Sequence, residues 1–68
     1  MQHYYVNKQA QKNGEHEVHT PRCTYLPEGD DGIYLGAFVT CKEALEAARA
    51  HFEKVNGCSW CCGACHSG

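Results

Sequence analysis

The sequence predicts a small α+β domain with a β-hairpin, a third strand, one α-helix and a C-terminal cysteine-rich knuckle. Three observations predict it: polar and apolar residues alternate on both sides of Asn13-Gly14, apolar residues recur at helical spacing after Thr40, and cysteines cluster from Cys58 onward. The chain is expected to be one domain, residues 1–68, because no linker or repeat divides it.

The strands are expected in the first part of the chain. Residues 3–10 alternate between polar and apolar types, and residues 15–20 are interpreted as the return strand of a hairpin. Asn13-Gly14 predicts a two-residue turn between them, because both residues tolerate a positive φ. A third strand is expected over residues 33–39, where Gly36 indicates a bulge or a close approach of another backbone.

A helix is predicted from about Cys41 to Val55. Thr40 and Glu43 have the spacing of a capping box, in which each side chain pairs with the backbone amide of the other residue. An apolar stripe follows at helical spacing: Ala44, Leu45, Ala48, Phe52 and Val55. Asn56-Gly57 is typical of a helix C-terminus, and we expect the helix to stop there.

The composition indicates that the fold needs support beyond its apolar core. A chain of 68 residues buries only roughly 60% of its unfolded surface, and such domains often add a metal, disulfides or a partner chain. No secretory signal is recognisable in residues 1–14, and no stretch approaches the ~18 apolar residues of a membrane span. We therefore expect a cytoplasmic location, where thiols stay reduced and clustered cysteines indicate metal binding or redox activity.

Two short motifs predict a metal site. His19 and Cys23 are separated by three residues, and Cys58 and Cys61 form a C-x-x-C motif. One imidazole and three thiolates are a common donor set for tetrahedral zinc, so we expect one zinc ion per chain bound by His19, Cys23, Cys58 and Cys61. The zinc would close a long loop and contribute on the order of 10–16 kcal/mol, more than a typical small domain's total stability.

The C-terminal run also contains other donors. Cys62 and Cys65 form a second C-x-x-C motif, and His66 follows it. The spacing leaves open whether Cys62, Cys65 or His66 replaces one of the four ligands, although adjacent cysteines such as Cys61 and Cys62 seldom reach the same ion. Otherwise, Cys62 and Cys65 are interpreted as spare thiols or as a redox pair.

Four further residues are of types that often have functional roles, but we expect each of them to have a structural role here. Cys41 would begin the helix, where the pKa of a thiol tends to fall, yet a packed and inert cysteine is the preferred interpretation over a reactive one. His16 is expected to be a strand histidine without a ligand role. Tyr25 and Trp60 are expected to cover the metal-binding knuckle rather than to stack on a ligand.

Several motifs together resemble a known family. The runs that carry the resemblance are Tyr5-Val6-Asn7-Lys8, His19-x-x-x-Cys23, Thr40-x-x-Glu43-Ala44 and Gly57-Cys58-x-x-Cys61. They resemble the small zinc-binding module of the Ada family, which implies an α+β zinc module with the ligands His19, Cys23, Cys58 and Cys61. The resemblance does not extend to alkyl transfer, which uses four cysteines in a basic DNA-binding setting.

A second resemblance covers nearly the whole chain. Gly14–His19 reads G-x-H-E-V-H and Gly57–His66 reads G-C-x-x-C-C-x-x-C-H, patterns similar to those of a group of small uncharacterised bacterial proteins. This resemblance implies no particular function.

Charge and motifs together favour a binding module over an enzyme. The net charge is −2, and the six basic residues form no run, so the electrostatic footprint of a nucleic-acid-binding protein is missing. We expect a zinc-stabilised module of unidentified role that binds a protein or nucleic-acid partner, the nucleic acid being less supported by charge, and no membrane. The alternative is a thiol redox, metal-handling or sensing protein that uses Cys61, Cys62 and Cys65. An enzyme is less expected, because no Glu or Asp is positioned by its spacing as the general base of a zinc site with an open position.

Overall fold

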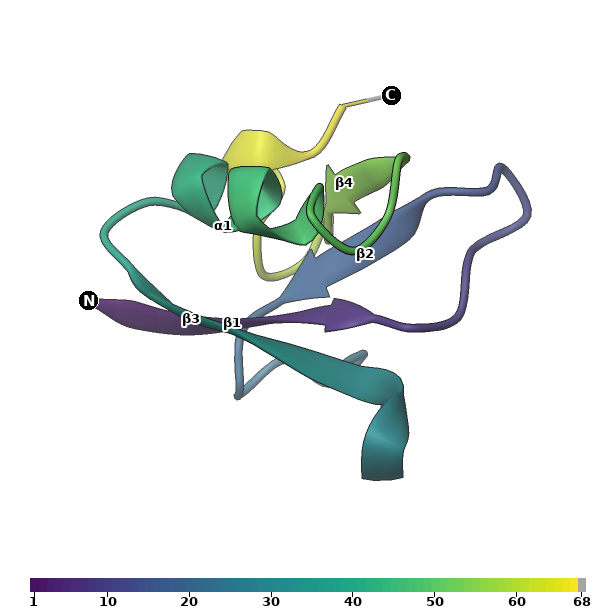
Figure 1. Cartoon of the computed structure of the whole chain (residues 1–68). Helices are drawn as coiled ribbons and strands as arrows, with labels where there is room; N and C mark the ends of the chain where they lie inside the picture. The colour runs from purple at the N-terminus through teal and green to yellow at the C-terminus, as the bar shows by residue number, and fades with distance from the viewer. Residues whose placement is uncertain (68) are drawn as a thin grey trace.

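The computed structural model describes residues 1–67 and has a four-stranded sheet with one helix packed against it (Figure 1). The strands are β1 (Gln2–Asn7), β2 (His16–His19), β3 (Gly32–Phe38) and β4 (Val55–Gly57). The helix is α1 (Cys41–Ala48), and the 3₁₀ turns are η1 (Gly29–Asp31) and η2 (Gly63–Cys65). The predicted α+β class is confirmed. No helix within residues 1–67 combines the length and the apolar character needed to cross a membrane.

The core lies between the sheet and α1. Strand order is β3-β1-β2-β4, so β1 and β2 are the two inner strands and supply most of the buried sheet residues. The fully or almost fully buried members of the core cluster are Tyr4, Val6, Val18, Ala44, Ala48 and Cys62. The apolar face of β1 and the apolar stripe of α1 therefore pack in one core, as the sequence pattern predicts.

The bulge expected at Gly36 is present. Tyr4 pairs with Gly36, whereas the next residue, Tyr5, pairs with Tyr34, so Leu35 is the extra residue in β3. Gly36 has a φ of 124°, a conformation that side-chain-bearing residues rarely adopt. The bulge shifts the register midway along the β1–β3 pair.

β1 and β2 pair antiparallel as the predicted hairpin, but the predicted two-residue turn between them is wrong. β1 ends at Asn7 and β2 begins at His16, so a longer connection replaces the two-residue turn. Within the connection, Gln11 N–H donates to the carbonyl of Glu15, and Gly14 N–H donates to the carbonyl of Gln11. At its two ends the bonds are long-range, from Lys8 N–H to the carbonyl of Asp31 and from His16 N–H to the carbonyl of Lys54. Gly14, with a φ of 84°, lies in a turn within the loop.

The predicted extent of the helix is also wrong, although its start is confirmed. Thr40 Oγ1 accepts a hydrogen bond from Glu43 N–H at 3.4 Å, and the Glu43 carboxylate accepts one from Thr40 N–H at 3.2 Å, which forms the capping box. The helix stops at Ala48 rather than Val55. Phe52 leaves the helix and stacks on His16, with ring centroids 3.6 Å apart.

The segment expected to end the helix forms β4 instead. Val55–Gly57 pairs in parallel with β2. Without β4, the backbone groups on this side of β2 would have no strand partner. The three bridges join His16 to Val55, Glu17 to Asn56 and Val18 to Gly57. Sheet pairing with a distant strand therefore overrides the local preference for a continued helix.

Candidate metal centre

Two strand ends and the loops that follow them create the centre. His19 is the last residue of β2, and Cys58 directly follows β4. The two strands run in parallel with Val18 opposite Gly57, and Cys58 N–H donates to the carbonyl of Val18 at 3.0 Å. The parallel pairing that the sequence did not predict therefore brings His19 and Cys58 side by side.

The loops after these strands add the other two thiols. Cys23 lies in the turn after β2, where its N–H donates to the carbonyl of Thr20. Cys61 lies in the turn after β4, which is closed by a hydrogen bond of 2.8 Å from Cys62 N–H to the carbonyl of Cys58. Each loop turns back on itself, so that both sulfurs return to the strand ends.

The donor atoms of His19, Cys23, Cys58 and Cys61 all lie within 4.8 Å of one another. The Cys23 and Cys58 sulfurs are 3.8 Å apart, and the Cys61 sulfur is 3.9 Å from His19 Nδ1. Two sulfurs bound to one tetrahedral zinc at ~2.3 Å are separated by about 3.8 Å. The spacing thus fits a shared ion, and the structure groups the same four residues that the sequence analysis selected.

Gly57 is required where the centre joins β4. A Cβ added to Gly57 would lie 2.8 Å from the carbonyl oxygen of Cys62 and 3.1 Å from the Cys62 Cβ. The second C-x-x-C motif, Cys62 to Cys65, therefore crosses directly over this glycine. Any side chain here would push the cysteine turn away from the end of β2.

His19 has the burial and protonation expected of a ligand. Its side chain is fully buried, and burial lowers its pKa, while the Glu17 carboxylate opposes that shift. The ring is therefore held neutral, which is the form that binds metals. Its Nδ1 faces the Cys61 sulfur, and its buried Nε2 has no hydrogen-bond partner, the nearest Glu17 oxygen being 3.8 Å away.

The thiols lie in a site that favours their neutral form when no cation is present. Burial raises the pKa of Cys23, and a hydrogen bond with Cys61 raises it further. Beside the group, burial and the neighbouring Cys61 raise the pKa of Cys62, which is not one of the four donors, to about 12. A divalent cation reverses this balance, because its charge outweighs the repulsion between thiolates.

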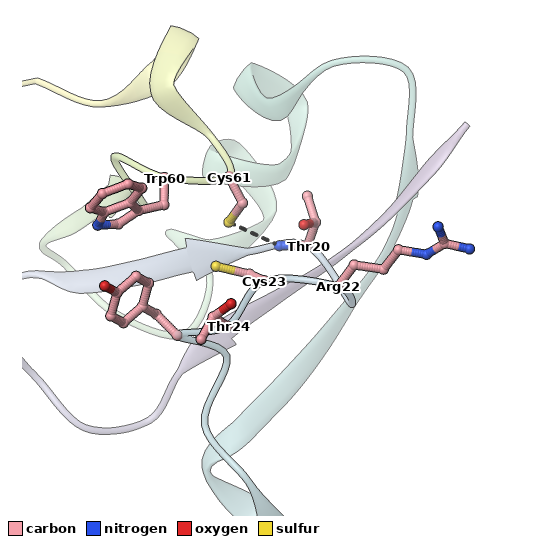
Figure 2. Close-up of a pocket in the computed structure, with 7 residues that line it drawn as sticks. Thr20, Arg22, Cys23, Thr24, Trp60 and Cys61 are labelled. Carbon is pink, nitrogen blue, oxygen red and sulfur yellow. Dashed lines mark hydrogen bonds between the residues drawn. The ribbon is translucent and has the colours of Figure 1, made fainter.

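One backbone donor already favours a negative sulfur in the centre. Thr20 N–H points at the Cys61 sulfur at 3.4 Å, as the dashed line in Figure 2 shows. Hydrogen bonds to a ligating atom orient it and stabilise its charged form. This contact is of the kind that a ligating thiolate receives, in a group whose donor atoms could hold a metal ion.

The three alternative ligands lie outside the group. Cys62 is buried in the core cluster, and Cys65 forms a disulfide with Cys41. His66 is exposed, and its Nδ1 bonds the carbonyl oxygen of Gly57 at 2.9 Å. His16 also remains outside, stacked on Phe52 as described above.

The disulfide corrects two interpretations of the sequence. Cys41 is not a packed free thiol, and the partner of Cys65 is Cys41 rather than Cys62. The two cysteines are 24 residues apart, with Cα atoms 6.3 Å from each other. No local motif marks such a pair, because it depends on how η2 packs against α1.

A small aromatic surface adjoins the centre. Tyr25 and Trp60 stack with ring centroids 5.8 Å apart, and they line a pocket of about 240 Å³ together with Cys23 and Cys61 (Figure 2). Their exposed fractions are 55% and 76%, so most of each ring contacts solvent instead of covering the sulfurs. Arg22 lines the same pocket, and its side chain extends away from the sulfurs in Figure 2.

Comparison of the chain with family models, with curated proteins and with solved structures finds no match. The resemblance to the Ada-like zinc module therefore stays a prediction. The chain has a four-stranded α+β fold in which a His/Cys group could hold a metal ion. The assignment of that group as a metal site therefore depends on the distances between its donor atoms and on their burial.

Proposed function

We propose that this chain is a zinc-stabilised interaction module with one zinc ion per chain, bound by His19, Cys23, Cys58 and Cys61. The observation that carries the proposal is the convergence of four donor atoms, from two strand ends and two loops, within 4.8 Å. Three sulfurs and one imidazole nitrogen suit zinc, which prefers tetrahedral sites with sulfur and nitrogen ligands. His19 Nδ1 is the proposed ligand atom of the ring, since it is the nitrogen that faces Cys61.

The proposed role of the zinc is structural. Four protein ligands fill a tetrahedral ion and leave no position for a water or a substrate. Cys23 and Cys58 are 35 residues apart, so a shared ion closes a loop that contains β3 and α1. In a chain with a small apolar core, that closure supplies much of the stability of the fold.

The aromatic pair beside the centre supports a protein partner. Tyr, Trp and Arg are the residue types that contribute most at protein interfaces, and Tyr25, Trp60 and Arg22 surround one pocket. The net charge of −2 gives no long-range attraction to a polyanion, which makes a nucleic-acid partner the weaker candidate. The zinc would hold both aromatic residues in place, because each is next to a ligand or two residues from one.

The metal is tested first on the untagged protein, purified with a thiol reductant. Elemental analysis is expected to give one zinc per chain, and a strong chelator is expected to abolish the far-UV circular dichroism of the fold. Cobalt substitution is expected to give the visible spectrum of a tetrahedral site with three sulfurs and one nitrogen. A metal-free protein whose spectrum survives the chelator would disprove the structural role.

The binding surface is tested separately by photo-crosslinking in cells. A photoreactive amino acid replacing Trp60 is expected to trap a discrete protein adduct, whereas the same amino acid replacing exposed Lys12 on the hairpin loop is expected to trap none. Adducts that are sensitive to nuclease would instead assign a nucleic-acid partner. Zinc content of both variants controls for a disturbed centre.

A further inference from the structure

The Cys41–Cys65 disulfide lies in an accessible pocket on the surface formed by α1 and η2. Cys41 is the first residue of α1, and Cys65 is the last residue of η2. Both cysteines are partly exposed and both line a pocket of about 440 Å³. A disulfide that opens into a pocket can be attacked by a thiol from solution, whereas a buried one cannot.

The wall of this pocket has charges that select the attacking thiol. Lys42, Glu46 and Arg49 line the pocket beside the disulfide. Arg49 pairs with Glu46 at 2.6 Å, so the charge of Lys42 remains uncompensated within the pocket. An exposed ammonium group at this position favours a thiol that carries a carboxylate.

We propose that the Cys41–Cys65 disulfide is a redox site that exchanges with a small, carboxylate-bearing thiol. In the first step the thiolate attacks the sulfur of Cys65, forms a mixed disulfide there and releases Cys41 as a thiolate. A second molecule of the thiol attacks the outer sulfur of the mixed disulfide, which releases Cys65 and a small-molecule disulfide. Two thiols are oxidised, one protein disulfide is reduced, and the two protons given up by the thiols protonate Cys41 and Cys65.

The position of Cys41 decides the direction of attack. It lies at the N-terminus of α1, where unpaired backbone N–H groups stabilise a negative charge. The better-stabilised thiolate is the better leaving group in thiol–disulfide exchange. Cys41 is therefore the leaving sulfur, and Cys65 is the sulfur that carries the mixed disulfide.

The redox site and the metal centre use separate cysteines. None of the four proposed ligands lines the pocket at the disulfide, and Cys58 and Cys62 are buried. The C-terminal segment also has anchors besides the disulfide, because Asn56 Nδ2 donates to the carbonyl of Ser67 and His66 bonds the carbonyl of Gly57. Reduction is therefore expected to leave the zinc centre intact.

The site is tested on the full chain in glutathione buffers that range from reduced to oxidised. Free thiols are trapped by alkylation and assigned by peptide mass mapping, and zinc is measured in parallel. We expect one two-electron transition, confined to Cys41 and Cys65, with zinc per chain unchanged. A pair that never oxidises, stays oxidised in fully reduced glutathione, or is reduced only when zinc is lost would overturn the proposal.

Two variants test the chemistry within the site. Cys41→Ser is expected to accumulate glutathione on Cys65 in oxidised glutathione, while Cys65→Ser accumulates less on Cys41. Lys42→Gln is expected to slow reduction by glutathione about threefold. The same variant is expected to leave the rate with uncharged mercaptoethanol unchanged. Equal effects of Lys42→Gln on both thiols would contradict the proposed selection by charge.

Discussion

The chain fastens its C-terminal segment to the rest of the fold at two places that differ in chemistry. At the end of β2 and β4, Cys58 and Cys61 meet His19 and Cys23 as free donors that suit a metal. On the surface of α1, Cys65 is joined to Cys41 by a covalent bond. With the proposed zinc bound, the first attachment is expected to be sensitive to chelators and acid, and the second is expected to be sensitive to reductants.

A small domain can contain both attachments because each uses its own cysteines at a different place in the fold. The donors of the metal group lie at the ends of paired strands, where Cys58 is 1% exposed and His19 is fully buried. The disulfide lies on the outer surface, where both cysteines are partly exposed. Burial alone does not separate the two sets, because Cys23 and Cys61 are as partly exposed as Cys41 and Cys65. The groups that the fold places beside each sulfur, rather than residue type, distinguish the candidate ligands from the disulfide cysteines.

The largest effect is expected from the loss of a buried ligand. Cys58→Ser removes a thiolate from the proposed zinc site and is expected to reduce bound zinc to about zero, with loss of the fold, because zinc contributes about 10 kcal/mol or more. Elemental analysis and far-UV circular dichroism measure both outcomes. Ser59→Ala, next to it and exposed, is the matched control and should retain one zinc and the native spectrum. A folded, zinc-loaded Cys58→Ser protein would remove Cys58 from the ligand set.

A smaller effect is expected at the second attachment. Replacing both Cys41 and Cys65 by serine removes a cross-link between residues 24 apart, which should lower the free energy of unfolding by about 3 kcal/mol. Urea unfolding of the oxidised proteins, with zinc in excess, measures the difference. The wild-type protein under reducing conditions should match the double variant. Unequal midpoints for these two samples would show that the substitutions act by another route.

Removing the carboxylate that orients His19 is expected to have a smaller effect on zinc binding than removing a ligand. Glu17 is the acidic group nearest the orphaned Nε2 of His19, and such carboxylates typically hold a metal-bound imidazole in position. Glu17→Gln is expected to weaken zinc binding about tenfold without unfolding the loaded protein. Competition with a coloured chelator measures the affinity, and Glu53→Gln, an exposed change elsewhere, is the control. An unchanged affinity would show that Glu17 does not support the ring.

The smallest effect is expected at the start of α1. Thr40→Ala removes the side-chain acceptor of the capping box and should cost about 1 kcal/mol of stability. Zinc content should not change, because Thr40 is remote in sequence from all four proposed ligands. Thermal unfolding of the zinc-loaded protein measures the loss. Thr40→Ser retains the hydroxyl and should therefore keep most of the stability that Thr40→Ala loses. An equal loss of stability in both variants would assign the effect to packing of the methyl group.

Local patterns in the sequence predicted several parts of the fold correctly. The capping box fixed the start of α1, and the glycine in the third strand marked the bulge. The spacing of His19 to Cys23 and of Cys58 to Cys61 selected four residues that the structure groups together. Each of these features depends on residues a few positions apart, so short-range backbone geometry is sufficient to predict it.

Contacts between distant segments decided the rest. The helix ends at Ala48 because the chain beyond it pairs with β2 as β4, a partner that lies about forty positions earlier and leaves no local signal. The same pairing brings His19 and Cys58 together, although each motif alone gives only two ligands. The Cys41–Cys65 disulfide likewise follows from the packing of η2 on α1.

The sequence by itself thus determined the fold class, the start of the helix and the two halves of the candidate metal site. Only the tertiary structure decided how the halves meet, which cysteines stay free and which are joined. The physical reason is that short motifs fix local dihedral angles and side-chain spacing, whereas strand pairing and burial depend on the whole chain at once.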